Sequence, residues 1–192
     1  MQLDAVFEKT ELMRKNHVEL SYCAGICLMY QCGCRISSIL QIEPSNVTLD
    51  GRVLLHQGKG SLPMVVYPVY YRDFWVNMGN SGKSPFLYQN YIYYYRLFKK
   101  YGLGGEYNFG ENKAVTASAR KSLARDVFGS SGDIEITAVA LGHKNQNSTT
   151  FYVDDKSNRI KQKKGILDNP KGIVNQLVIC KNGVIRTKKS TF

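Results

Sequence analysis

The sequence lacks any apolar run approaching the ~18 residues that a membrane-spanning helix needs. Its first residues, 1–5, also lack the basic stretch and apolar core of a secretory signal. We therefore expect a cytoplasmic protein with no membrane partner. No internal repeat and no second independent core are visible, so we expect one principal domain.

Acidic residues are scarce: the 192 residues include 15 Asp and Glu against 26 Lys and Arg, a formal net charge of +11. A surplus of this size favours a polyanionic partner. Nucleic acid is the first candidate and an anionic membrane surface is the second. Because 43% of the residues are hydrophobic and 21% are charged, the composition is typical of a globular chain rather than a disordered one.

The cysteines lack the paired Cys-x-x-Cys spacing of most structural zinc sites. Four lie at irregular spacing in one apolar stretch (Cys23, Cys27, Cys32 and Cys34), and Cys180 stands apart. We therefore expect buried free thiols in a reducing compartment rather than a zinc site.

Hydrophobic periodicity predicts a mainly helical α+β chain with a small antiparallel β-sheet. Apolar residues lie on nearly all sides of 18–31, so this helix should be buried in the core. Asp-Gly and Gly-Lys-Gly turns predict three strands across 47–67, and Asn-Gly at 182–183 predicts a second hairpin. The other expected helices cover residues 3–13, 36–40, 68–78, 89–101, 116–128 and 133–141.

Aromatic residues are concentrated in the helix expected over 89–101. Tyr91, Tyr94, Tyr95 and Phe98 recur at helical spacing beside basic residues. Such rings could stack on bases, but the spacing favours a place in the core.

Arg35 stands where an arginine is costly. It follows Cys32-Gly33-Cys34 and begins a short helix whose apolar face holds Ile36 and Ile39. A guanidinium among thiols and aliphatic side chains needs either an anion or a route to solvent for its charged end. Both interpretations stay open for this residue alone.

Two further basic residues occupy places suited to a phosphate. Lys59 lies between two glycines, where its ammonium can reach an anion, although such turns more often serve only to reverse the chain. Arg120 lies near the expected start of the helix over 116–128, where the helix macrodipole also favours an anion.

The segment from Leu141 to Tyr152 places an imidazole nine residues before a phenol. His143 follows a Gly-led turn, and Tyr152 follows a polar helix start at 147–149. This pair suits nucleophilic attack on phosphorus, because the imidazole can hydrogen-bond a non-bridging oxygen while the phenol attacks. The alternative is a Gly-capped helix followed by a solvent-facing tyrosine.

Together, Arg35, Lys59, Arg120, His143 and Tyr152 resemble the catalytic set of the tyrosine recombinase (phage integrase) family. The family's Gly-x-Arg-[Ile/Val]-Ser-Glu motif resembles residues 33–38, and its hairpin lysine resembles Lys59, 24 positions after Arg35. Its His-x-x-Arg motif aligns with residues 117–120, and its Leu-Gly-His box resembles residues 141–143. The likeness covers residues 18–155.

The sequence departs from the family pattern at two places. Ser38 replaces the glutamate of the first motif, and Ala117 replaces the histidine of the second. Because Ala117 can neither hydrogen-bond a phosphate nor assist proton transfer, Ser118 and Lys121 are the candidates to substitute for it. A slower enzyme and a DNA-binding relative that no longer cuts both remain as alternatives.

The resemblance implies a site-specific recombinase that cuts and rejoins double-stranded DNA through a 3′-phosphotyrosine, without metal, ATP or another cofactor. Arg35 and Arg120 would bind the scissile phosphate, His143 would hold a third oxygen, Lys59 would protonate the leaving 5′-oxygen, and Tyr152 would be the nucleophile. It also implies a prokaryotic or mobile-element-encoded protein that forms a homotetramer on DNA and is monomeric when free. A type IB topoisomerase, which relaxes supercoils by the same chemistry, is the alternative enzyme.

On this interpretation, residues 1–17 are an N-terminal helix or linker remnant, 18–155 the catalytic domain with Lys59 on its hairpin, and 156–192 a basic C-terminal tail. Family members usually add an N-terminal domain that closes around the duplex, so the chain is either a catalytic fragment or a compact recombinase. We expect the tail to pair with its own domain without DNA and to exchange between protomers in the assembled complex.

Overall fold

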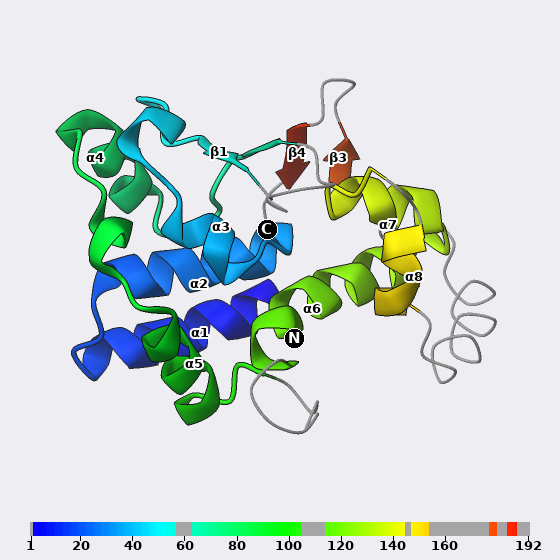
Figure 1. Cartoon of the computed structure of the whole chain (residues 1–192), viewed down its shortest axis with the longest axis horizontal. Helices are drawn as coiled ribbons and strands as arrows, with labels where there is room; N and C mark the ends of the chain where they lie inside the picture. Colours follow the sequence, from blue (N-terminus) through cyan, green and yellow to red (C-terminus); the bar gives the residue numbers. More distant parts are fainter. Residues whose placement is uncertain are drawn as a thin grey trace, which may run out of the picture.

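The computed structural model describes residues 2–56, 63–104, 114–144, 147–153, 177–179 and 184–187. Its helices are α1 (Leu3–Lys15), α2 (Leu20–Cys32), α3 (Ile36–Leu40), α4 (Arg72–Ser81), α5 (Tyr91–Lys100), α6 (Ala114–Ser131), α7 (Ile134–Ala140) and α8 (Asn147–Val153), with short 3-10 helices η1 (Pro44–Asn46) and η2 (Pro85–Tyr88). Its strands are β1 (Val53–Leu55), β2 (Met64–Val66), β3 (Leu177–Ile179) and β4 (Val184–Thr187). The predicted mainly helical α+β fold is confirmed (Figure 1).

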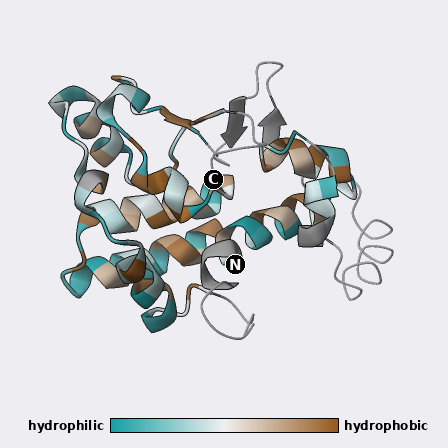
Figure 2. Ribbon diagram, in the orientation of Figure 1, coloured by the Kyte–Doolittle hydropathy of each residue, from teal (hydrophilic) through white to brown (hydrophobic). Residues whose placement is uncertain are grey.

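Helix α2 is the centre of the core. All of its residues except Leu20 and Gln31 are buried, and Figure 2 shows apolar residues along much of its length. Such a helix needs neighbours on every side, and α1, α3, α4 and α6 all pack against it. Gly33 ends α2 in the left-handed conformation, with φ 63°. The predicted buried helix is confirmed.

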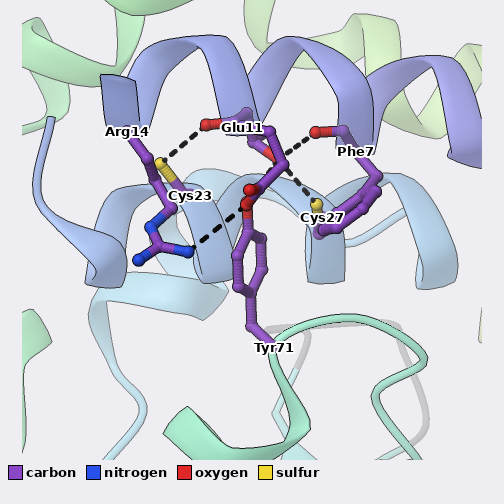
Figure 3. Close-up of polar contacts among 7 residues, drawn as sticks. Phe7, Glu11, Arg14, Cys23, Cys27 and Tyr71 are labelled. Carbon is purple, nitrogen blue, oxygen red and sulfur yellow. Dashed lines mark hydrogen bonds and ion pairs between the residues drawn. The ribbon is translucent and has the colours of Figure 1, made fainter. Parts of the chain in front are cut away.

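The cysteines around α2 are buried, as the sequence predicts. Cys23, Cys27, Cys32 and Cys34 are buried free thiols. Figure 3 shows two of them facing α1, where the Sγ of Cys27 lies 3.4 Å from the hydroxyl oxygen of Thr10. Burial raises the pKa of Cys27 to about 12, so this thiol stays protonated at neutral pH. In the described ranges, no cluster of three or more His, Cys, Asp or Glu could hold a metal ion.

The hairpin predicted around the Gly-Lys-Gly turn is present, but the strand before it is not. Strands β1 and β2 pair antiparallel, with Leu55 opposite Met64. The expected strand over 47–49 is reduced to one bridge between Val47 and Val53. Asp50 and Gly51 instead form a tight turn before β1, in which Gly51 has φ 81°.

The C-terminal strands extend this small sheet. Strands β3 and β4 form the predicted antiparallel hairpin, with Val178 opposite Arg186. Strand β4 then pairs parallel with β2, giving the order β1-β2-β4-β3. The sheet is therefore mixed, with one parallel pair between its two antiparallel hairpins. The tail strands therefore pair with their own domain in this single chain, which is the arrangement expected without DNA.

Helix α4 begins later and ends later than its sequence suggests. It starts at Arg72 instead of residue 68, and it continues through Gly79, which the sequence places in a loop. Gly79 packs tightly within the helix, because a Cβ at this position would lie only 2.8 Å from the carbonyl oxygen of Thr48. The glycine lets the helix lie close to the backbone at Thr48.

Helix α5 divides its aromatic residues between core and surface. Tyr94 and Phe98 are fully buried, whereas Tyr91 is 45% exposed. The prediction that these rings belong to the core is therefore right for Tyr94 and Phe98 and wrong for Tyr91, while Tyr95 is half-buried. Close contact with α2 explains the buried ring, because a Cβ at Gly25 would lie 2.6 Å from the hydroxyl of Tyr94.

Helices α6, α7 and α8 pack together and position the candidate site (Figure 1). Helix α6 is longer than predicted at both ends, running from Ala114 to Ser131. The side chain of Asp133 accepts hydrogen bonds from the backbone N–H groups of Glu135 and Ile136, and so caps α7 as predicted. Across the described residues, no helix is long and apolar enough to cross a bilayer.

Candidate active site

Arg120 lies at the centre of the candidate site. Its side chain is 1% exposed. Its Nη1 donates to the carbonyl oxygen of Gly33 at 3.0 Å, and its Nη2 donates to that of Leu141 at 2.9 Å. A buried cation needs partners of this kind to offset its desolvation. One guanidinium therefore joins the turn that precedes Arg35 to the turn that precedes His143.

The position of Arg120 corrects one expectation from the sequence. The macrodipole acts mainly within the first turn of a helix. Because α6 begins at Ala114, Arg120 is the seventh residue of the helix and lies beyond that turn. Contacts with the two carbonyl oxygens, not the end of a helix, determine where this guanidinium lies.

Arg35 reaches the surface beside this buried pair of turns. Gly33 reverses the chain at the end of α2, Cys34 is fully buried, and Arg35 then caps the start of α3 with extended backbone. Its side chain is exposed. This exposure gives the charged end of Arg35 a route to solvent, which is one of the two interpretations that the sequence leaves open. In solvent the guanidinium can also meet an anion.

His143 lies close to both arginines. It follows Gly142, which has φ 66°, and its backbone N–H donates to the carbonyl of Ala138 at 2.9 Å. Burial, together with the positive charges of Arg120 and Arg35, lowers the pKa of His143 to about 4. The imidazole is therefore uncharged at neutral pH, within the electrostatic influence of two permanent cations that favour an anionic ligand.

Helix α8 is tied to His143 by a hydrogen bond between side chains. The hydroxyl oxygen of Thr149 lies 2.8 Å from Nδ1 of His143, and Thr149 is fully buried. Tyr152 lies three residues later in the same short helix, so its backbone is within one turn of this bond. The side chain of Tyr152 lies outside the described part of the structure.

Lys59 falls in the segment 57–62, outside the described residues. The strands on either side of it are described. Strand β1 ends at Leu55 and β2 begins at Met64, which places Lys59 in the connection of an antiparallel hairpin. Its role therefore stays a prediction.

The candidate substitutes for the missing histidine differ in their surroundings. Ala117 is in the first turn of α6, and its side chain is outside the described part. Ser118 is buried, and its Oγ lies 3.7 Å from the place that a Cβ on Gly104 would occupy. Ser118 thus faces the chain that follows α5. Lys121 is half-buried and lies four residues after Ala117, so the two positions are neighbours on one face of α6.

Ser38, which stands in place of the family's glutamate, is buried and lines a surface depression of about 330 Å³. The depression also involves Glu43 and His56. It lies between the end of α3 and strand β1, apart from the carbonyl contacts of Arg120.

Sequence reasoning missed Thr149 and the two carbonyl partners of Arg120. In the sequence, Thr149 is recognisable only as part of a polar helix start. Two adjacent threonines inside a seven-residue helix were a signal, because a buried threonine needs a hydrogen-bond partner. Backbone carbonyl groups leave no mark in a sequence, so Gly33 and Leu141 could not be identified as partners of Arg120.

The fold is similar to that of solved site-specific recombinases bound to DNA. Two crystal structures of the recombinase XerH match this chain, one a post-cleavage complex with palindromic difH substrate and the other a pre-cleavage complex with difH. The post-cleavage complex is 19% identical to this chain with a TM-score of 0.56, and the match covers 87% of this chain and 52% of the XerH chain. The pre-cleavage complex is 20% identical with a TM-score of 0.53, and the match covers 86% of this chain and 51% of the XerH chain.

This chain thus spans about half the length of the XerH chains that it matches. At this level of identity the likeness establishes the fold. No protein-family model matches the sequence, and no curated protein matches it.

Proposed function

We propose that the chain is the catalytic part of a tyrosine recombinase, which cuts and rejoins double-stranded DNA through a 3′-phosphotyrosine. The observation that carries the proposal is the convergence of Arg35, Arg120 and His143 from three separate parts of the chain, next to the helix that holds Tyr152. The net charge of +11 and a fold shared with DNA-bound recombinases support it.

In this proposal the arginines bind the scissile phosphate. Guanidinium groups suit phosphate oxygens because they are planar, permanently charged and carry five N–H donors. Their positive charge stabilises the negative charge that grows on the oxygens as phosphorus becomes five-coordinate. This is the electrostatic role that a metal ion has in other phosphoryl-transfer enzymes. The neutral imidazole of His143 donates to a further oxygen.

The covalent step exchanges one phosphate ester for another. The phenol oxygen of Tyr152 attacks phosphorus and forms the new P–O bond as the phenol releases its proton to solvent, while the bond to the 5′-oxygen breaks. Lys59 gives a proton to that leaving oxygen as the general acid. Because the tyrosine ester conserves the bond energy, a 5′-hydroxyl of another strand reverses the step without ATP.

We also propose a homotetramer on DNA, with monomers in its absence, because exchange between two duplexes needs four strand cuts. Such an enzyme works where the DNA is, in the cytoplasm of a prokaryotic cell. Exchange of the β3–β4 hairpin between protomers would couple the four sites. In the structure, strand β4 pairs with β2 of its own chain through only two residue pairs, Val65 with Val184 and Val66 with Ile185.

The proposal is tested by incubating the chain with a pool of nicked duplexes of randomised sequence, in parallel with a supercoiled plasmid. Denaturation and sequencing then recover covalently attached DNA. A recombinase gives adducts enriched in one sequence and leaves an unrelated plasmid supercoiled. Relaxation of any plasmid would support a type IB topoisomerase instead. Binding without adducts would support a DNA-binding relative that no longer cuts, the alternative suggested by Ala117 in place of the family's histidine.

A further inference from the structure

Thr149 is a buried polar residue of α8 that bonds outside its own helix. Its hydroxyl oxygen lies 2.8 Å from Nδ1 of His143. The neighbouring Thr150 behaves differently, because its hydroxyl donates to the carbonyl of Asn147 at 2.8 Å, within the helix. A bond to the local backbone is the ordinary use of a helical threonine. The contact of Thr149 with a ring nitrogen on another segment therefore needs a separate explanation.

The partner of Nδ1 decides what the rest of the imidazole can do. A neutral imidazole has one N–H group and one nitrogen with a lone pair, and the bond at one nitrogen determines the state of the other. The ring of His143 is neutral at pH 7, because burial and the adjacent arginines lower its pKa to about 4. Non-bridging oxygens of a phosphodiester only accept hydrogen bonds, so the ring binds them only through a protonated nitrogen.

We propose that Thr149 is a positioning residue for strand breakage: its hydroxyl donates to Nδ1 of His143 and so holds the imidazole in the tautomer that carries its proton on Nε2. This inference rests on the proposed function, in which His143 donates to the scissile phosphate. Because Thr149 lies three residues before Tyr152, the same hydrogen bond holds the nucleophile's helix against the turn that carries His143. Thr149 acts through His143 and not by contact with DNA.

Three variants of the full chain separate this role from general packing. Thr149→Val keeps the shape of the buried side chain and removes only the hydroxyl. Thr149→Ser restores the hydroxyl with less volume. Thr150→Val is the matched control, because it removes the same group from the adjacent residue, where the bond is local to α8. Thermal unfolding of each variant reports its stability.

The first measurement needs no DNA. Two-bond correlation of imidazole ¹H and ¹⁵N nuclei identifies the tautomer of His143, with His143→Gln supplying the assignment. We expect the Nε2–H tautomer in the parent chain, Thr149→Ser and Thr150→Val. Thr149→Val should show both tautomers and a higher His143 pKa, because a donor to the neutral ring favours that form. An unchanged tautomer and pKa in Thr149→Val would overturn the inference.

The second measurement is the rate of covalent adduct formation on the nicked DNA recovered with the parent chain. Thr149→Val should slow this step about tenfold with little change in DNA affinity, whereas Thr149→Ser and Thr150→Val should stay near the parent rate. Equal rates for Thr149→Val and Thr150→Val would overturn the positioning role. If the parent chain forms no adduct although the tautomer responds as expected, the proposed function fails and the catalytic role of Thr149 fails with it, while the hydrogen bond itself stands.

Discussion

The guanidinium of Arg120 donates to the carbonyl oxygen of Leu141 at 2.9 Å, across 21 residues of sequence. The same group donates to the carbonyl of Gly33 at 3.0 Å, across 87 residues. These contacts hold the turns that precede His143 and Arg35. Arg120, which is proposed to bind the phosphate, therefore also links the turns that carry Arg35 and His143, the two other residues proposed to bind it.

The two arginines should respond differently to substitution. Arg120→Met leaves two buried carbonyl groups without their donor, which should lower the free energy of unfolding by about 2–5 kcal/mol. Arg35→Met changes an exposed side chain and should alter it by less than about 0.5 kcal/mol. Both should abolish adduct formation. Urea unfolding followed by circular dichroism measures the difference, and an equal loss of stability in the two variants would contradict the bridging role of Arg120.

Stability should depend on pH through His143. Its pKa is about 4 in the folded chain, below the ordinary value of 6.5. Between these values the unfolded chain binds more protons, so this contribution to stability is complete above about pH 6.5 and is lost as the pH falls toward 4. Parallel unfolding curves of the parent chain and His143→Gln from pH 4 to 8 test this. The pH slope between 4 and 6.5 should be shallower in the variant, and identical slopes would contradict the assignment.

Ala117→His tests the gap in the second motif. A restored hydrogen bond to a developing charge is worth about 1.5–3 kcal/mol, so adduct formation should accelerate about ten- to a hundredfold. The adduct rate on the recovered DNA measures this. A neutral or harmful effect would mean that another group already has the role.

Lys121→Ala would then identify that group if it abolished cleavage and left DNA affinity unchanged. Ser118→Ala is the comparison, because Ser118 faces Gly104. No effect from either substitution would mean that the site works without a substitute for the histidine.

DNA affinity should fall steeply with salt. Each phosphate that the basic residues neutralise contributes about −0.9 to the slope of log affinity against log salt concentration on duplex DNA. Fluorescence anisotropy at several salt concentrations gives that slope. A binding constant that hardly changes between low and moderate salt would rule out the nucleic-acid interpretation. Arg35→Met should make the slope about one unit shallower for each phosphate contact that it removes.

Much of the fold could be predicted because its signals are local. Apolar residues on all sides predict that α2 is buried, and the glycine at position 33 predicts where it ends. In the same way, Asp133 predicts the start of α7, which it caps. The end of helix α4 was misplaced because the sequence does not show that Gly79 packs tightly against the backbone of Thr48 within the helix. The parallel pairing of β4 with β2 was likewise beyond local patterns, since it joins strands more than a hundred residues apart.

In the candidate site, too, the sequence predicted residues but not the contacts between distant segments. Spacing and chemistry predicted Arg35, Arg120 and His143 as site residues, and the structure places both arginines near enough to His143 to lower its pKa. The sequence could not show that the guanidinium of Arg120 is buried between two carbonyl groups, since main-chain partners depend on how distant turns meet. It also gave no indication that Thr149 bonds to His143, because the contact crosses from a turn to a separate helix.

The central claim is that Tyr152 becomes covalently attached to DNA. The most direct measurement is peptide mapping by mass spectrometry of the adduct trapped on a nicked duplex, for the parent chain and for Tyr152→Phe. The account predicts a 3′-phosphonucleotide on Tyr152 in the parent chain, and no adduct but nearly unchanged DNA affinity in Tyr152→Phe, which loses one oxygen and little surface. An adduct on another residue, or one that persists in Tyr152→Phe, would contradict it.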